Sequence, residues 1–415
     1  MQQEDTNPVQ HNSRPNGGRV RTRPAPLTGS TVIIGLVSLF ADISTEMMYP
    51  LLPSFITEVL HAPVVALGII EGVAQGASSV LAGLSGWISD RLGKRKPVAF
   101  AGYALTAVSK PFIGMAGSWM VVLAARFSDR FGKGIRSAPR DALLAESAPA
   151  GERGRAFGFE RAMDSTGAVL GPILAIALIQ LARLNDRTVF YLATIPASIA
   201  AILILAVREA PGAVQSGGSS LRLTLAGTPP QYRRLLVIIG VFGLANSANA
   251  FLILRAGQLG LATGWTILAY ALYNAVSALA SMPAGSASDR FGRRNLLIIG
   301  YSLYAISYIG FGAARSAWLV WPLFALYGLF PALTDGVAKA LAVDTAGKTG
   351  RGTAVGLYST VVGITQIAAS YVGGELWDRM GPASTFFFGA ALALLAVVLL
   401  FLLLPARQNA STVTA

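Results

Sequence analysis

The sequence has no cysteine and only two histidines, His11 and His61, among its 415 residues. The lack of cysteine excludes disulfides, iron–sulfur clusters held by thiolates and thiol catalysis. A histidine-rich metal site is not expected either, and we expect neither a bound metal nor a cofactor. The sequence contains no nucleophile–base set and no phosphate-binding loop, so it does not favour an enzyme.

Charged residues are scarce as well. Lys, Arg, Asp and Glu make up 13% of the chain, against about 25% in a typical soluble domain, and hydrophobic residues make up 53%. The mean hydropathy is +0.56. Apolar runs near the ~20 residues that cross a bilayer recur along the whole length. They predict an all-α integral membrane protein with twelve transmembrane helices, over residues 31–56, 64–88, 97–116, 119–145, 157–181, 188–207, 235–257, 264–284, 295–314, 318–343, 353–374 and 384–404.

The sequence contains an internal repeat. GWISDRLGKRK at Gly86–Lys96 is matched by GSASDRFGRRN at Gly285–Asn295, 199 residues later. ALLAESAP at Ala142–Pro149 is matched by ALAVDTAG at Ala340–Gly347, at an offset of 198. Because both copies run in the same direction, we expect two six-helix halves related by a pseudo-two-fold axis along the membrane normal.

The repeat and the composition divide the chain into five parts. We expect a disordered basic tail over residues 1–29, six-helix bundles over residues 30–207 and 235–404, a linker over 208–234 and a second tail over 405–415. The linker contains the Gly- and Ser-rich stretch PGAVQSGGSS, which is typical of a flexible connector.

The net charge of +13 is unevenly placed. With the predicted spans, 20 of the 33 Lys and Arg residues fall on one side of the membrane and four on the other. This bias predicts that both termini lie in the cytoplasm. We further expect a multi-pass, monomeric protein of the bacterial inner membrane. No basic segment is interleaved with aromatic residues outside the membrane skeleton, so the lipid bilayer, and not nucleic acid, is the expected partner.

The repeated pattern G-x-x-[AS]-D-R-x-G-[KR]-[KR] and the six-plus-six arrangement resemble the major facilitator superfamily over roughly residues 30–405. In that family the pattern lies between helices two and three and between helices eight and nine. The matching residues are Gly86, Asp90, Arg91, Gly93, Lys94 and Arg95 in the first copy and Gly285, Asp289, Arg290, Gly292, Arg293 and Arg294 in the second. The resemblance implies that these residues form a gate that latches the cytoplasmic side. A positive-inside anchor without gating is the alternative.

The fifth predicted span is similar to the g-x8-G-x3-G-P motif of the proton antiporters of this family. Gly158, Gly167, Gly171 and Pro172 match it, whereas Ala175 and Ile176 replace two further glycines. Small residues and a proline bend allow this helix to pack and flex against a neighbour. The resemblance implies an antiporter, and packing alone is the alternative.

Acidic residues inside the spans are candidates for proton coupling. Asp42 and Glu46 lie four residues apart, on one face of the first helix, and Glu160 and Asp164 repeat this spacing in the fifth. Ionised carboxylates are costly at this depth, so they should face a cavity or share protons. Glu71 in the second span carries less weight, because we expect it nearer the outer surface. A structural ion pair is the alternative for Asp42 and Glu46.

The span over 119–145 is unusually charged. Its counterpart, 318–343, is plainly a membrane helix, with Asp335 and Lys339 as its charged residues, so we predict that 119–145 is a membrane helix that lines the central cavity. A stripe at spacings of three or four residues runs down one of its faces, with Arg130 beside it. The stripe consists of Arg126, Asp129, Lys133, Arg136 and Arg140. We predict that Asp129 takes part in proton coupling and that the basic groups bind substrate, with a structural network as the alternative.

In the second half, neutral polar side chains are the candidate substrate contacts. They are Asn246, Asn249, Tyr273, Asn274 and Gln366. Together the features predict a secondary active transporter with alternating access that couples protons to the efflux of a small molecule, a drug or a metabolite. The alternatives are a transporter, importing or exporting, of an organic anion or metal chelate that uses the basic residues of 119–145, and a channel or receptor-like protein.

Overall fold

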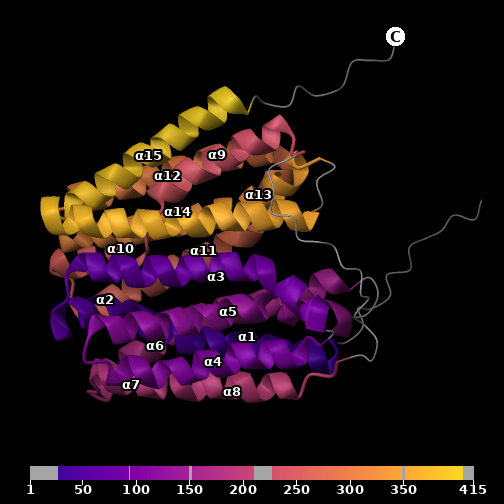
Figure 1. Cartoon of the computed structure of the whole chain (residues 1–415). Coiled ribbons are helices and arrows are strands. Elements are labelled where there is room, and N and C mark those ends of the chain that lie inside the picture. Colours follow the sequence, from indigo (N-terminus) through magenta and orange to yellow (C-terminus); the bar gives the residue numbers. More distant parts are fainter. Residues whose placement is uncertain (1–26, 93, 149–151, 210–226, 348–350, 405–415) are drawn as a thin grey trace, which may run out of the picture.

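A computed structural model describes residues 27–92, 94–148, 152–209, 227–347 and 351–404, with the side chains of 83, 86–92, 289 and 351 left aside. The predicted tails, apart from a few flanking residues, and most of the predicted linker therefore lie outside the described residues. The described chain is a bundle of long helices that lie roughly side by side (Figure 1).

The first half of the bundle contains six helical segments. They are α1 (Gly29–Met48) continued by η1 (Tyr49–Leu51), α2 (Leu52–Ser54) and η2 (Phe55–Val59); α3 (Val64–Leu92); α4 (Lys96–Met115); α5 (Trp119–Ser147); α6 (Arg153–Ile176) continued by η3 (Ala177–Leu181); and α7 (Asp186–Leu192) with α8 (Thr194–Leu205). The hydroxyl of Thr28 accepts a hydrogen bond from the Thr31 N–H at 3.2 Å and so caps the start of α1. The same hydroxyl donates to the carbonyl of Ser147 at 2.9 Å, which joins this start to the end of α5.

The second half repeats this order. Its segments are α9 (Pro230–Ala245) with α10 (Ala250–Gln258); α11 (Thr263–Phe291); α12 (Arg293–Ala313); η4 (Ala317–Leu319) with α13 (Val320–Thr345); α14 (Arg351–Met380); and α15 (Pro382–Leu403). The two most extensive contacts between the halves are those of α3 with α14 and of α6 with α11. Figure 1 shows α3 and α14 lying next to each other at the boundary.

Eleven of the described helical segments are long and apolar enough to cross a membrane. The predicted span that fails this test is α5, because of its many charges. Yet α5 is one continuous helix of 29 residues, about 43 Å long at 1.5 Å per residue, and it packs lengthwise on α3 and α4. The predicted fold of two six-helix halves is confirmed, with α5 as the twelfth helix.

Equivalent ion pairs appear in the two halves. Arg95, before α4, pairs with Glu146 near the end of α5, and Arg293, at the start of α12, pairs with Asp344 near the end of α13. Asp344 lies 198 residues after Glu146, which is the offset of the second repeated stretch, whereas Arg293 aligns with Lys94, the residue before Arg95. The repeated motifs therefore tie the same helix ends together in both halves.

The end of the bundle at which α1 begins and α15 ends is called the terminal face, and the other end is the opposite face. Toward the opposite face the halves are packed tightly. A Cβ atom on Gly374 of α14 would approach the Cα of Val65 to 2.5 Å, and one on Gly363 would approach the Gly76 carbonyl to 2.8 Å. Small residues on α3 and α14 thus allow the two backbones to touch.

Asp378 closes the opposite face. Its two carboxylate oxygens accept hydrogen bonds from the backbone N–H groups of Val64 and Val65, at 3.0 and 2.8 Å. These are the first residues of α3, whose N–H groups have no partner within their own helix. One side chain of the second half therefore caps a helix of the first half and stabilises the closed opposite face.

We expect Asp378→Ala to open the opposite face. Hydrogen bonds to charged groups contribute about 1.5–3 kcal/mol each, so the loss should raise the population of the open state at least ~10-fold. Because the chain has no cysteine, Ser370→Cys supplies a single probe in the seam, at a site that is fully buried. The measurement is the rate at which a soluble maleimide labels this probe.

The matched control is Glu375→Gln. Glu375 lies on the same helix, one turn before Asp378, but it forms an ion pair with Arg379 of its own helix, at 2.7 Å. The control should leave the labelling rate of Ser370→Cys unchanged. Equal rates in the Asp378→Ala and Glu375→Gln backgrounds would show that the cap does not hold the face closed.

Candidate functional site

A cavity of about 530 Å³ lies between the two halves, in the part of the bundle nearer the terminal face. On α3 it is lined from Gln75 to Ala82, in the middle part of the helix, and on α14 from Tyr358 to Gln366, in the first half of the helix up to its middle. Its volume lies within the range of small-molecule pockets. The cavity is closed toward the opposite face by the packed seam.

Five of the predicted substrate residues line this cavity. They are Lys133, Asn246, Asn249, Tyr273 and Gln366. Asn274 does not line it; its side-chain amide donates across the halves to the carbonyl of Ala168 at 3.1 Å. The substrate role of all of these residues stays a prediction, but the structure brings the five together around one space.

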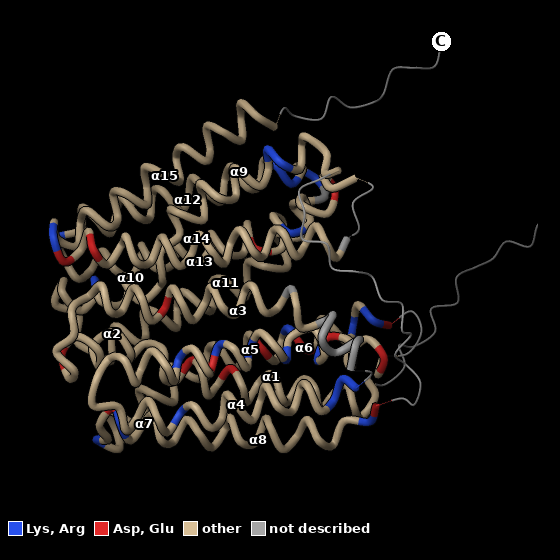
Figure 2. Tube along the Cα trace, in the orientation of Figure 1, with Lys and Arg blue, Asp and Glu red and all other residues tan. Residues whose placement is uncertain are grey.

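The cavity carries an excess of positive charge. Lys133 of α5, Arg161 of α6 and Lys339 of α13 line it, and Asp335 is the one carboxylate among its described lining residues. Figure 2 shows that the charges inside the bundle belong mostly to the first half, whereas the second half carries most of its charge at helix ends. Asp335 and Lys339 are the exceptions inside the second half, and they face the cavity.

The wall of the second half is built around a broken helix. Between α9 and α10 the chain leaves the helical path at residues 246–249, and Asn249 lies at the start of α10. Its side-chain amide donates to the Tyr273 hydroxyl at 3.2 Å, and its carbonyl oxygen accepts from the Tyr327 hydroxyl at 2.8 Å. Unwound helices at this depth are where transporters commonly place their binding sites.

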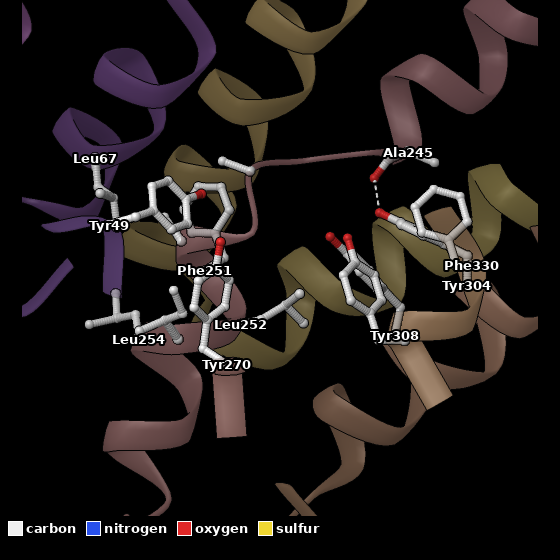
Figure 3. Packing of buried hydrophobic residues seen from close by; sticks show 14 of the residues in the cluster. Tyr49, Leu67, Ala245, Phe251, Leu252, Leu254, Tyr270, Tyr304, Tyr308 and Phe330 are labelled. Atoms are coloured by element: carbon white, nitrogen blue, oxygen red, sulfur yellow. Dashed lines mark hydrogen bonds between the residues drawn. The ribbon is translucent and has the colours of Figure 1, made fainter. Parts of the chain in front are cut away.

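Tyrosines also satisfy the backbone at this break. The Tyr304 hydroxyl donates to the carbonyl of Ala245 at 2.6 Å, at the last turn of α9 (Figure 3). Ser247, inside the break, shares a hydrogen bond of 3.1 Å with the Tyr308 hydroxyl. The break is thus held open by partners from α12, because a backbone carbonyl without a partner is costly inside a membrane.

Two predicted coupling carboxyls meet between α1 and α6. The side chains of Asp42 and Asp164 are joined by a hydrogen bond, and the positive charge of Lys133 acts on both. Asp42 is 8% exposed. Two ionised carboxylates have only acceptor atoms, so a hydrogen bond between them requires one shared proton. This pair can therefore hold a proton inside the bundle.

Glu46 lies one turn further along α1 and links the two halves. Its Oε2 accepts a hydrogen bond of 2.9 Å from the hydroxyl of Tyr270, on α11. The ring of Tyr270 also lies 5.5 Å from that of Tyr49, and Figure 3 shows these two tyrosines facing each other. A change in the charge of Glu46 would therefore alter its hydrogen bond to Tyr270, which joins the two halves.

The glycines of the predicted antiporter-like motif lie against these carboxyls. A Cβ on Gly167 would approach the Cβ of Asp42 to 3.0 Å, and one on Gly171 would approach the Cβ of Glu46 to 2.8 Å. Pro172 is buried beside them. Gly158 has open space around it instead. Three of the four motif residues thus bring α6 close to α1 where the carboxyls lie.

Glu160 lies two turns before Gly167, nearer the terminal face. Its Oε1 accepts a hydrogen bond of 2.7 Å from the Ser38 hydroxyl and pairs at 3.0 Å with Arg140. Arg140 also donates to Asp141 at 2.7 Å. The predicted carboxyls Glu160, Asp164, Asp42 and Glu46 therefore follow one line along the contact between α1 and α6.

A separate network of buried charges surrounds Arg126. Its guanidinium donates three hydrogen bonds of 2.7–2.9 Å to Glu71 of α3, and its Nη1 lies 3.2 Å from Asp129. The ammonium of Lys110, on α4, lies 3.3 Å from the other oxygen of Asp129, and Nε of Arg130 lies 3.8 Å from Oδ2. All five side chains are at most 5% exposed. The sequence interpretation missed Lys110 and placed Glu71 too near the surface.

The remaining predicted basic residue of this stripe, Arg136, packs on α4. Its guanidinium lies 4.1 Å from the ring centre of Tyr103 and donates to the Thr106 hydroxyl at 2.9 Å. None of Arg126, Arg130 and Arg136 lines the cavity. Their burial among fixed partners favours a structural role over contact with substrate.

The predicted gating residues are described only in part. The side chains of Gly86, Asp90, Arg91 and Asp289, and the whole of Gly93, lie outside the described residues. Lys94, Gly285 and Arg290 are exposed, and Gly292, with φ of +84°, joins α11 to α12. Arg95 and Arg293 pair within their own halves, as described above. A latch between the halves stays a prediction.

Known proteins are similar to the chain along most of its length. A family model described as Major Facilitator Superfamily matches residues 34–270 and 235–414. An uncharacterized MFS-type transporter of Methanocaldococcus jannaschii is 34% identical over 380 residues, which cover 90% of this chain and 94% of that protein. The multidrug resistance protein MdtH of Baumannia cicadellinicola is 24% identical over 340 residues, 80% of each chain. The crystal structure of a variant of the nucleoside transporter NupG matches with a TM-score of 0.78 at 12% identity, covering 90% of this chain and 100% of that one.

Proposed function

We propose that this chain, which belongs to the Major Facilitator Superfamily of membrane transporters, exports a small molecule, a drug or a metabolite, in exchange for protons. The hydrogen-bonded carboxyls of Asp42 and Asp164 carry this proposal. They form a proton site inside the bundle, next to the cavity residue Lys133, where a proton and a substrate can influence each other.

The proposed cycle is alternating access around the central cavity. With both termini in the cytoplasm, the described state has its cavity on the cytoplasmic side and its periplasmic side closed by Asp378. Proton transfer along the carboxyl line reaches Glu46, whose hydrogen bond to Tyr270 joins the halves. A change at this bond is the step that couples the proton to the movement of one half against the other.

The direction of transport rests on two supports. Gly167, Gly171 and Pro172 match the antiporter-like motif and pack against the coupling carboxyls. The multidrug resistance protein MdtH, a relative at 24% identity, is named for resistance to drugs. Both favour export in exchange for protons.

The experiment uses purified protein in proteoliposomes with an acidic lumen. Three drug-like probes are offered outside: ethidium as a cation, chloramphenicol as a neutral molecule and fluorescein as an anion. With the membrane potential held at zero by valinomycin and equal potassium on both sides, a one-to-one exchange supports an accumulation ratio of about 10 per pH unit for each probe, and a protonophore should abolish it. Saturable flux that only equalises concentrations, whatever the pH gradient, would contradict proton coupling.

The charge of the cavity favours a second candidate, transport of an organic anion. Lys133, Arg161 and Lys339 outnumber Asp335 in its lining, and charge-assisted hydrogen bonds from such groups suit carboxylate or phosphate. Of the basic residues on α5 first considered for this role, only Lys133 lines the cavity. Accumulation of fluorescein alone among the three probes would select this candidate.

A further inference from the structure

A second cavity, called the lateral groove, lies between α6 and α11. Its volume is about 740 Å³, and it is lined by Gly158, Arg161, Ala162, Ser165, Thr166, Val169, Leu170, Ala275, Ala278, Leu279, Ser281 and Met282. Most of this lining is apolar. The groove follows the first part of α6 and the later part of α11, so it lies on the side of the terminal face, where the two halves diverge.

The groove is open on its outer side. Leu279 and Met282 are 78% and 82% exposed, and Leu170 is 39% exposed. In a protein that spans a membrane, side chains exposed at this depth meet acyl chains and not water. The lateral groove is therefore an apolar recess that faces one leaflet of the bilayer.

Arg161 is the single described residue that lines both the lateral groove and the central cavity. Its side chain is 73% exposed and pairs with Asp164 at 3.6 Å. Arg161 lies eight residues after the start of α6, so its Cα is about 12 Å from that end of the helix. This depth is near the boundary between headgroups and acyl chains of that leaflet, where an arginine side chain reaches the polar layer.

We propose that the substrate is an anionic amphiphile that enters the central cavity sideways from this leaflet. This rests on the transport function proposed above and names its substrate class. The alkyl part occupies the lateral groove, and the acidic head binds Arg161. Lys133 and Lys339, further inside, attract the head onward into the cavity, where Asn249, Tyr273 and Tyr327 offer hydrogen bonds.

The test is photolabelling of the full chain in nanodiscs of zwitterionic phospholipid. The probe is dodecanoic acid that carries a diazirine on its chain, and the matched probe is the corresponding dodecanol. We expect peptides of α6 and α11 to be labelled by the acid about 10-fold more than by the alcohol, because a hydrogen bond to a charged group contributes about one decade in affinity.

Two variants address the two parts of the site. Arg161→Gln should lower labelling by the acid about 10-fold and leave labelling by the alcohol unchanged. Ala278→Trp should fill the groove and lower labelling by both probes. The controls are Arg315→Gln, an exposed arginine of the opposite face, and Ile202→Trp, an exposed position on α8; both should label like the parent protein.

Equal labelling by acid and alcohol in the parent protein would show that bulk lipid alone fills the groove and would overturn the inference. So would acid labelling that neither Arg161→Gln nor Ala278→Trp reduces. The proteoliposome assay is run on the same preparations. Proton-driven transport with no specific labelling rejects only the lateral entry of an anionic amphiphile, whereas specific labelling with no proton-driven transport rejects only the coupling.

Discussion

Glu71→Gln is expected to lower the free energy of unfolding by about 3–5 kcal/mol. Glu71 is 1% exposed and accepts three hydrogen bonds from Arg126. Without its carboxylate, the cations Lys110, Arg126 and Arg130 share Asp129 as their one remaining carboxylate within the described network. Removal of one partner of a buried pair costs this much because the other charge is left buried and uncompensated. The measurement is the denaturant midpoint of the purified protein, followed by tryptophan fluorescence.

Arg126→Gln should cost less than Glu71→Gln. It leaves two cations, Lys110 and Arg130, with two carboxylates, Glu71 and Asp129, so the network is neutral. The double variant Glu71→Gln with Arg126→Gln removes one charge of each sign and should cost clearly less than the sum of the two single variants. Glu375→Gln, in an exposed pair, should stay within about 0.5 kcal/mol of the parent. Additive single effects would show that the two side chains do not act as a pair.

The membrane topology could be predicted from the sequence because each span is marked by a run of consecutive, mostly apolar residues. Each predicted span overlaps one observed helical segment, and the repeat in sequence returns as the equivalent pairs Arg95–Glu146 and Arg293–Asp344. The highly charged α5 was identified from its apolar counterpart in the second half, since hydropathy alone does not select it. A repeat carries information about a helix whose own composition is misleading.

The partners of the buried charges could not be predicted in the same way. Spacing places Arg126, Asp129, Lys133 and Arg136 on one side of α5, but it does not tell which neighbouring helix each side chain meets. In the structure Arg126 turns to α3, Arg136 to α4 and Lys133 to the cavity. Lys110, in an otherwise apolar run, was a usable signal, because a lone cation inside a span needs a partner. Its partner, Asp129, becomes visible only in three dimensions.

The candidate site could be predicted in part: its carboxyls were identified, but their contacts were not. The sequence predicted Asp42 and Asp164 as coupling carboxyls, each in a pair spaced by four residues on its own helix. Their direct contact depends on the close approach of α6 to α1 at Gly167, which spacing alone does not establish. The same holds for Glu46, whose partner Tyr270 comes from the other half. Contacts between the halves depend on the conformational state, and a sequence encodes more than one state.

Asp42→Asn is expected to abolish accumulation against a gradient while sparing exchange. An amide at this position can still donate a hydrogen bond to Asp164, so the contact between α1 and α6 is kept, but it cannot release a proton. With one unit of pH gradient, the accumulation ratio of the transported probe should fall from about 10 to about 1. Exchange of labelled for unlabelled probe, with no pH gradient, should stay within about twofold, because an amide at position 42 beside an ionised Asp164 has the same net charge as the carboxyl pair that shares one proton. Both quantities are measured in proteoliposomes.

Asp164→Asn should abolish accumulation in the same way, because it removes the other member of the carboxyl pair. It also removes the ion-pair partner of Arg161, at 3.6 Å, and leaves that guanidinium free to bind an anion. The two variants should therefore agree in accumulation and differ in apparent affinity, with Asp164→Asn binding an anionic probe more tightly. Glu58→Gln, an exposed carboxylate at the end of the segment that begins with α1, is the control and should keep the ratio near 10. If Asp42→Asn and Asp164→Asn both keep that ratio, the proton that drives transport binds elsewhere.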